Sequence, residues 1–361
     1  MFVGLGASRV RTLFENARKK SPCVIFIDEI DTVGATRERA FASNRQTLNQ
    51  LLQELDGINN RDNIVVIGAT NLISKVDKAL LRPGRFDRRI GLALPNMEGR
   101  EELFELYLKK KRRYSSEIDY KDLAKATRGL SGADIENIVN NAAIDAVNHN
   151  DPFIAQDNIE RAIDRQLIGV ELKNRHVEEK DSYITAVHEI GHALVSMLRN
   201  KETLKVNKVT IIPRNTGSAG HTSFLPSTES SFKGVKKAHM LREIESCLGG
   251  LAAEEVIFGK ENRTLGAESD LQRARSIAER MVTQYGMSRL GPATYYKNER
   301  TIADTTQERI DEEIDYIIGT AYSEVCKLLT SHKYKMTKLV DKLVEHETLS
   351  GQQLQDYFEK L

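Results

Sequence analysis

The chain has 361 residues, of which 40% are hydrophobic and 29% charged, and its 53 basic residues balance 52 acidic ones to a net charge of +1. This composition is typical of a globular protein of two or three domains and excludes a disordered chain. Because the charge is nearly neutral and no long basic run occurs, nucleic acid is not expected as a partner.

Residues 1–96 alternate helical and strand patterns. Apolar residues recur with helical spacing over 8–20, and a continuous apolar run over 23–27 ends in two acids, which predicts a strand buried on both faces. A further helix is expected over 44–55 and a second buried strand over 64–69. Since strands alternate with helices, this region is predicted to form a parallel α/β sheet.

Residues 97–172 carry helical patterns only, which predicts a small helical domain. Its expected helices cover 98–111, 132–148 and 155–169. Ser131 precedes the second of them with Asp134 three residues on, an acidic variant of the capping box. The charged stretch over 171–181 is interpreted as a linker.

Residues 173–361 are predicted to form a third, mainly helical region. Its expected helices cover 183–199, 240–258, 271–285 and 306–329. A strand is predicted over 206–213, and a glycine-containing loop leads from it to a short extended segment over 221–225.

The sequence His188-Glu189-Ile190-Gly191-His192 lies inside the predicted helix 183–199 and matches the pattern H-E-x-x-H. The i, i+4 spacing puts both imidazoles on one helix face, about 5–6 Å apart at Cβ, where they can share a metal. Glu189 is turned about 100° away from His188, so it can take a proton from metal-bound water. The alternative is two surface histidines on an ordinary helix, but the helical phase favours a zinc hydrolase.

A catalytic zinc usually has three protein ligands and one open position. The third ligand is not at the metzincin position, where this chain has Val195 and Leu198, and no Glu occurs between 203 and 228. The remaining candidates are Glu254, Glu255, Glu268 and Asp270. Asp270 lies at the start of the predicted helix 271–285, where a helix cap and a metal ligand are equally plausible.

Motifs of nucleotide chemistry lie in the first region. Asp28 and Glu29 close the strand 23–27 as in the Walker B motif of ATPases, where the Asp helps to hold Mg²⁺ and the Glu polarises water, although many strands end in acids. Arg82 and Arg85 could reach a neighbouring subunit's γ-phosphate or form a solvated turn. Asn71 could orient water or serve as a turn residue. The phosphate-binding loop G-x-x-x-x-G-K-[ST] does not occur in the 361 residues.

In combination, these motifs resemble the membrane-anchored AAA+ zinc proteases of the FtsH family, and within it most closely the mitochondrial inner-membrane i-AAA protease. The matching segments, besides 188–192, are 1–4, 6–11, 26–31, 46–57, 68–71, 82–88, 130–134 and 282–288. The resemblance covers essentially the whole chain. It implies a multi-domain fold with a partial α/β AAA+ ATPase core at 1–96, an α-helical lid at 97–172 and a mainly α-helical zinc metallopeptidase domain at 173–361.

The resemblance also implies a role for each matching residue. The implied zinc ligands are His188, His192 and Asp270, with Glu189 as catalytic base. The implied ATP-site residues are Asp28 and Glu29 of Walker B, Asn71 as the sensor-1 asparagine, and Arg82 and Arg85 as arginine fingers for the neighbouring subunit. Phe2 matches the aromatic of the central pore that grips protein substrates. The segment 221–225 resembles an edge strand that pairs with extended substrate.

The chain departs from the family in two places. Asp56-Gly57-Ile58 stands where the family has Asp-Gly-Phe. The family's Walker A loop and transmembrane anchor lie upstream of the pore motif, on which this chain begins. We therefore expect an N-terminally truncated product of a longer protease; the alternative is a natural short form that has lost ATP binding.

The implied function is that of an ATP-dependent zinc metalloendopeptidase that unfolds and degrades membrane-associated or misfolded proteins within a homo- or hetero-hexameric ring. Its cofactors would be Zn²⁺ and ATP with Mg²⁺. Because ATP binding needs the missing loop, the ATPase is predicted to be inactive in this chain alone. The alternative is a non-ATPase fragment that acts as an assembly or chaperone subunit.

The implied location is a membrane, with the mitochondrial inner membrane favoured over the bacterial one and attachment through the missing N-terminal segment. The fragment alone is expected to be soluble, because its longest apolar run is five residues and a spanning helix needs about 20. Three scattered cysteines form no disulfide framework, so a reducing compartment fits best.

Overall fold

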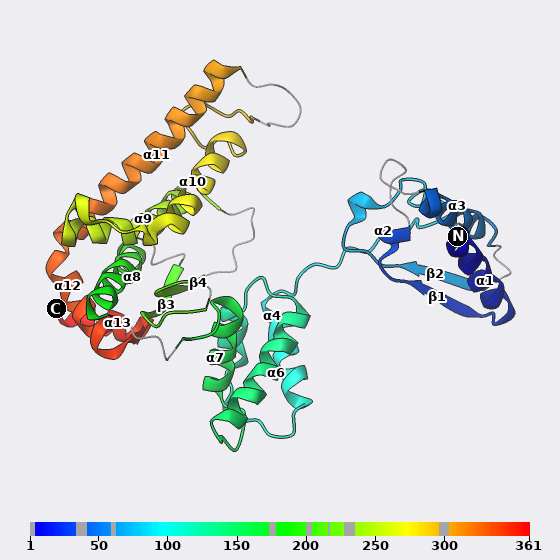
Figure 1. Cartoon of the computed structure of the whole chain (residues 1–361), viewed down its shortest axis with the longest axis horizontal. Coiled ribbons are helices and arrows are strands. Elements are labelled where there is room, and N and C mark those ends of the chain that lie inside the picture. Colours follow the sequence, from blue (N-terminus) through cyan, green and yellow to red (C-terminus); the bar gives the residue numbers. More distant parts are fainter. Residues whose placement is uncertain are drawn as a thin grey trace. The chain divides into compact units, whose positions relative to one another are not determined.

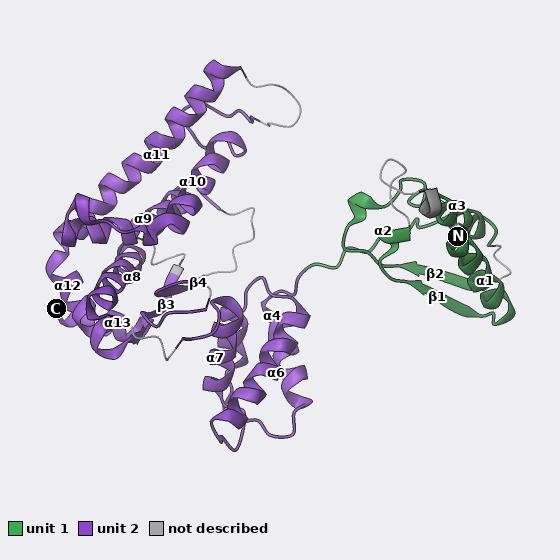
Figure 2. Ribbon diagram, viewed as in Figure 1, with its two compact units in different colours: residues 1–93 green, residues 94–361 purple. Residues whose placement is uncertain are grey.

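The computed structural model describes residues 4–33, 42–58, 63–172, 178–199, 204–215, 217–226, 235–295 and 303–361 (Figure 1). The chain forms two compact units, residues 1–93 and 94–361 (Figure 2). Phe2, the predicted pore residue, lies outside the described residues. None of the helices in the described ranges combines the length and the apolar character that crossing a bilayer requires.

The first unit is an α/β arrangement, as the sequence predicts. Its elements are α1 (Leu5–Lys19), β1 (Cys23–Ile27), α2 (Ile30–Val33), α3 (Ala42–Asp56) and β2 (Ile64–Gly68). The two strands pair in parallel, with Ile27 opposite Gly68 at their carboxyl ends. Helix α3 buries Leu48, Leu51, Leu52 and Leu55 in a core shared with Phe14 of α1. These four leucines follow the i, i+3, i+4, i+7 spacing of a single helix face.

The predictions that the strand 23–27 is buried on both faces and that 64–69 is a second buried strand are wrong in the described structure. Ile25 is buried in the core, but Val24 and Phe26 are 62% and 61% exposed, and Val65 and Ile67 of β2 are exposed as well. Successive side chains of a strand point to opposite faces, so only one face of the sheet packs against this core. A continuous apolar run shows that both faces are apolar, but it does not show which elements cover them.

The second unit begins with the helices α4 (Met97–Lys109), α5 (Tyr120–Ala126), α6 (Gly132–Asn148) and α7 (Gln156–Leu167). The capping box predicted at Ser131 is present, because its side chain and that of Asp134 each bond the other's backbone N–H. Helix α5 was not predicted. Its seven residues are too few for a periodic pattern, although Asp119 caps it with two hydrogen bonds.

The described residues in the rest of this unit form six helices and a small sheet, which α8, α12 and α13 contact. The helices are α8 (Glu179–Arg199), α9 (Lys237–Phe258), α10 (Glu268–Thr283), α11 (Asp304–Ser331), α12 (Lys333–His346) and α13 (Gly351–Lys360). The antiparallel sheet has the order β4 (His221–Pro226), β3 (Leu204–Thr210), β5 (Thr348–Ser350), so β4 is an edge strand. The predicted strand 206–213 thus begins earlier and ends at Thr210, while β5, α12 and α13 were not predicted.

Helices α8 and α9 approach each other closely at two glycines. A Cβ on Gly191 would collide with the carbonyl oxygen of Gly249, and a Cβ on Gly249 would lie 2.8 Å from the carbonyl oxygen of Gly191. Only glycine permits this contact between backbones. It brings the turn of α8 that contains His188 and His192 directly against α9.

Candidate metal centre

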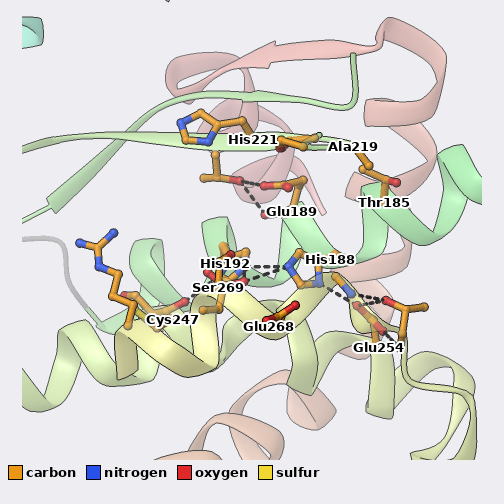
Figure 3. A pocket seen from close by; sticks show the side chains of 18 of the residues that line it. Thr185, His188, Glu189, His192, Ala219, His221, Cys247, Glu254, Glu268 and Ser269 are labelled. Atoms are coloured by element: carbon orange, nitrogen blue, oxygen red, sulfur yellow. Dashed lines mark hydrogen bonds and ion pairs between the residues drawn. The ribbon is translucent and has the colours of Figure 1, made fainter. Parts of the chain in front are cut away.

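His188, Glu189 and His192 lie in the buried middle of α8. Their helix packs Ala186, Val187, Ile190 and Leu194 into the main core of this unit. The alternative of two surface histidines is therefore wrong. Figure 3 shows the two imidazoles beside each other, and their Nε2 atoms are 3.1 Å apart.

Asp270 completes this cluster from α10. The helix begins at Glu268 with Ala267 as its N-cap, so Asp270 lies within the first turn and is not the cap residue. Its Oδ2 lies 3.2 Å from Nε2 of His188 and 3.2 Å from Nε2 of His192. Of the two interpretations that the sequence left open, the geometry favours the metal ligand.

The outer nitrogens of both imidazoles are bonded to fixed acceptors. Nδ1 of His188 lies 2.7 Å from Oε1 of Glu254, and Nδ1 of His192 lies 2.7 Å from the carbonyl oxygen of Ser246. Each Nδ1 must carry the hydrogen in these contacts, so the neutral rings turn the lone pairs of Nε2 toward each other and toward Asp270. Three acceptor atoms that face one another require a positive charge between them, either a proton or a metal.

The electrostatics of the cluster agree with this requirement. Burial disfavours the charged imidazolium of His188, but hydrogen bonds with Asp270 and Glu254 outweigh burial and raise its pKa to about 10. Burial likewise disfavours the Asp270 carboxylate, yet hydrogen bonds from His188 and His192 hold its pKa below the usual range. The surroundings therefore stabilise a positive charge at the centre of the cluster.

The donor set fits zinc. Two imidazole nitrogens and one carboxylate oxygen are the ligand types of catalytic zinc sites, and a tetrahedral ion with bonds of about 2.0–2.1 Å separates its ligand atoms by about 3.3 Å. The observed separations of 3.1–3.2 Å are close to this value. In the described part of the chain, these three residues are the one group of metal-ligand type.

The other three candidates for a third ligand do not join the cluster. Glu254 is fully buried and bonds the outer nitrogen of His188, while its Oε2 accepts from the backbone N–H of Thr264 at 2.7 Å. Glu255 accepts a hydrogen bond from Tyr322. Glu268 lines the cleft beside the cluster. Glu254 therefore fixes the imidazole of His188 instead of joining the cluster, and no pattern in the sequence indicated this contact.

Glu254→Gln is expected to weaken zinc binding by about 10–100-fold, because the amide cannot accept both the Nδ1–H of His188 and the N–H of Thr264. Competition with a chromophoric chelator measures this affinity. Glu255→Gln is the matched control, since it makes the same change one residue away and should leave zinc affinity unchanged. Equal affinities of the two variants would show that Glu254 does not orient His188.

Glu189 does not enter the cluster but borders the same cleft. The cleft has a volume of about 1040 Å³. Figure 3 shows His221 and Ala219 on one side, and Glu268 and Ser269 on the other. The carboxylate of Glu189 is bonded by the hydroxyl of Thr222 on β4, whose Oγ1 lies 2.6 Å from Oε2. No pattern in the sequence indicated this contact.

The residues predicted to form the ATP site follow the two strands of the first unit. Asp28 and Glu29 come directly after β1 and Asn71 comes shortly after β2, so all three lie at the carboxyl edge of the parallel sheet and are exposed. Arg82 is exposed on the turn after Leu80. Asp28, Glu29 and Asn71 therefore lie at the edge where open α/β sheets bind their ligands.

Arg85 has a partner that the sequence did not indicate. Its Nε and Nη2 donate to the two carboxylate oxygens of Asp56 at 2.7 and 2.8 Å, and its Nη1 donates to the carbonyl oxygen of Ala79. Asp56 is the first residue of the Asp-Gly-Ile segment noted above. The hydrogen bond with Arg85 also lowers the pKa of Asp56.

Comparison with known families matches each part of the chain. Residues 175–357 match Peptidase family M41, residues 1–94 match the ATPase family associated with various cellular activities (AAA), and residues 117–161 match the AAA+ lid domain. The cluster of His188, His192 and Asp270 lies within the match to Peptidase family M41, as do the residues that line its cleft, apart from Leu167.

Curated relatives span nearly all of the chain. The ATP-dependent zinc metalloprotease FTSH 11, chloroplastic/mitochondrial, of Arabidopsis thaliana is 44% identical over 98% of the chain and 43% of its own length. FtsH 3 of Symbiobacterium thermophilum is 43% identical over 100% of the chain and 59% of its own length. YME1L1 of Homo sapiens is 39% identical over 98% of the chain and 46% of its own length. The chain thus spans about half the length of the curated relatives it matches.

Proposed function

The chain belongs to the FtsH family of AAA+ zinc metalloproteases, and on this premise we propose that His188, His192 and Asp270 hold zinc and that Glu189 is the catalytic base. The observation that carries the proposal is the set of three ligand-type atoms, 3.1–3.2 Å apart, beside a buried carboxylate and an open cleft. Zinc, when bound there, polarises the peptide carbonyl and lowers the pKa of its bound water.

The residues of the chain supply the remaining parts of a hydrolytic site. Glu189 takes the proton of the attacking water and delivers it to the leaving amine. Glu254 and the Ser246 carbonyl fix the orientation of the two imidazoles. Strand β4 is the edge of its sheet and borders the cleft, so an extended peptide can pair with it along the backbone.

We also propose that the chain divides into an AAA+ core at 1–96, a lid at 97–172 and the peptidase at 173–361. In a hexameric ring, Phe2 would grip membrane-associated or misfolded protein substrates. Asp28, Glu29 and Asn71 would serve ATP with Mg²⁺ in their own subunit, and Arg82 and Arg85 would serve the ATP of the neighbour. The mitochondrial inner membrane is the favoured location.

No step of ATP hydrolysis is assigned to the 361 residues themselves. They contain no G-x-x-x-x-G-K-[ST] loop to hold the phosphates. For the same reason, a non-ATPase assembly or chaperone subunit is the second candidate function. The metal-type cluster favours the peptidase, because a scaffold has no need of three converging ligand atoms.

The 361-residue chain is expected to bind about one zinc and to cleave unfolded fluorogenic peptides weakly, at a rate that ATP does not change. A chelator should abolish cleavage, and added zinc should restore it. Peptide fluorescence and metal analysis provide the two readouts. A zinc-loaded chain that cleaves no peptide would favour the chaperone or assembly subunit. ATP turnover by this chain would contradict the expectation that hydrolysis needs a G-x-x-x-x-G-K-[ST] loop.

A further inference from the structure

The carboxylate of Glu189 is held by an element other than its own helix. Glu189 on α8 and Thr222 on β4 are separated by 33 residues in sequence, and each is only 7% exposed. Oγ1 of Thr222 donates to Oε2 of Glu189 at 2.6 Å and lies 3.1 Å from the carbonyl oxygen of the same residue.

The loop before β4 supports the same contact. A Cβ on Gly220 would lie 2.9 Å from Cγ of Glu189 and 2.7 Å from Cγ2 of Thr185, both on α8. Only glycine lets the backbone come this close to the stem of the Glu189 side chain. The stem is therefore confined by Gly220, and one oxygen of its carboxylate is fixed by Thr222.

We propose that Thr222 is a positioning residue for the catalytic base. A glutamate has three rotatable side-chain bonds, and a displacement of about 1 Å at a reacting group can cost about 10²-fold in rate. In the described residues, the Thr222 hydroxyl is the side-chain group that bonds the Glu189 carboxylate, and Oε1 has no partner there. By holding Oε2, Thr222 leaves Oε1 for the attacking water.

Thr222 also lies on the strand that is proposed to bind the substrate. Thr222 belongs to the edge strand on which an extended peptide can pair, so the backbone that would align the scissile bond also carries the group that aligns the base. This inference rests on the proposed function, because it takes Glu189 as the base.

Thr222→Val tests the proposal, because it removes the hydroxyl with little change in shape. We expect kcat for peptide cleavage to fall by about tenfold or more, with KM changed less than about twofold and zinc content unchanged. Thr222→Ser keeps the hydroxyl and should restore most of kcat. Thr222→Ala repeats the test without the branched side chain if valine does not fit.

Thr210→Val is the matched control. Thr210 is also buried, on the neighbouring strand β3, and its hydroxyl bonds Thr348 and the carbonyl oxygen of Glu347 instead of Glu189. It should lower thermal stability without changing kcat. A folded, zinc-loaded Thr222→Val chain with the wild-type kcat would overturn the proposal, as would equal losses of kcat in Thr222→Val and Thr210→Val.

Glu189→Gln separates this inference from the function on which it rests. If Glu189→Gln cleaves peptide normally, the assignment of the base is wrong, and the proposal for Thr222 fails with it. If Glu189→Gln is inactive while Thr222→Val retains full kcat, only the positioning proposal fails.

Discussion

Glu189→Gln is expected to reduce peptide cleavage by about 10²–10⁴-fold while zinc remains bound. The amide has nearly the shape of the carboxylate and can still accept the hydrogen bond from Thr222, but it cannot take a proton from water. Because Glu189 is not one of the three clustered ligand-type residues, metal content should not change. Initial rates on a fluorogenic peptide, measured together with metal analysis, report both effects.

Glu179→Gln is the appropriate control for this variant. It makes the same substitution on the same helix, at an exposed position in the first turn of α8. Its cleavage rate should equal that of the wild type. Normal cleavage by Glu189→Gln would show that another group accepts the proton.

Gly250→Ala is expected to abolish zinc binding without unfolding the protein. A Cβ at this position of α9 would lie 2.5 Å from Nε2 of His188 and 2.6 Å from Nε2 of His192, beside the point where the three ligand atoms converge. The imidazoles must move away, and such overpacking typically costs about 1–3 kcal/mol. Zinc content should fall from about one per chain to almost none, and cleavage should be lost with it.

Gly319→Ala provides the comparison, because a Cβ at Gly319 on α11 meets no atom within 4 Å. Replacing glycine by alanine inside a helix stabilises it by about 0.5–1 kcal/mol, so this variant should retain its zinc and its activity. Full zinc loading and wild-type cleavage by Gly250→Ala would mean that the metal does not bind between His188 and His192.

The shared helix face of the two histidines was predictable, because it depends only on their spacing along one helix. The spacing of His188 and His192, read in helical phase, gives one shared face, and the structure places both rings there. The role of Asp270 could not be decided from the neighbouring residues, because an aspartate at the start of a helix can equally be a cap or a metal ligand. The choice depends on where α10 begins and on how it packs against α9.

Contacts between distant segments could not be predicted in this way. The hydrogen bond from Thr222 to Glu189 and the pair of Arg85 with Asp56 join residues 33 and 29 positions apart, and neither has a sequence signature. The exposed faces of β1 and β2 likewise depend on which elements cover them. Helix α12 is different, because Met336, Leu339, Val340 and Leu343 follow the i, i+3, i+4, i+7 pattern and could have revealed it.

The most direct test of the metal centre is anomalous scattering at the zinc absorption edge from crystals of the zinc-loaded chain. We predict a single strong peak within about 2.0–2.2 Å of Nε2 of His188, Nε2 of His192 and Oδ2 of Asp270. A peak bound by Glu254 instead of Asp270, or no peak between the two histidines, would contradict the proposed centre.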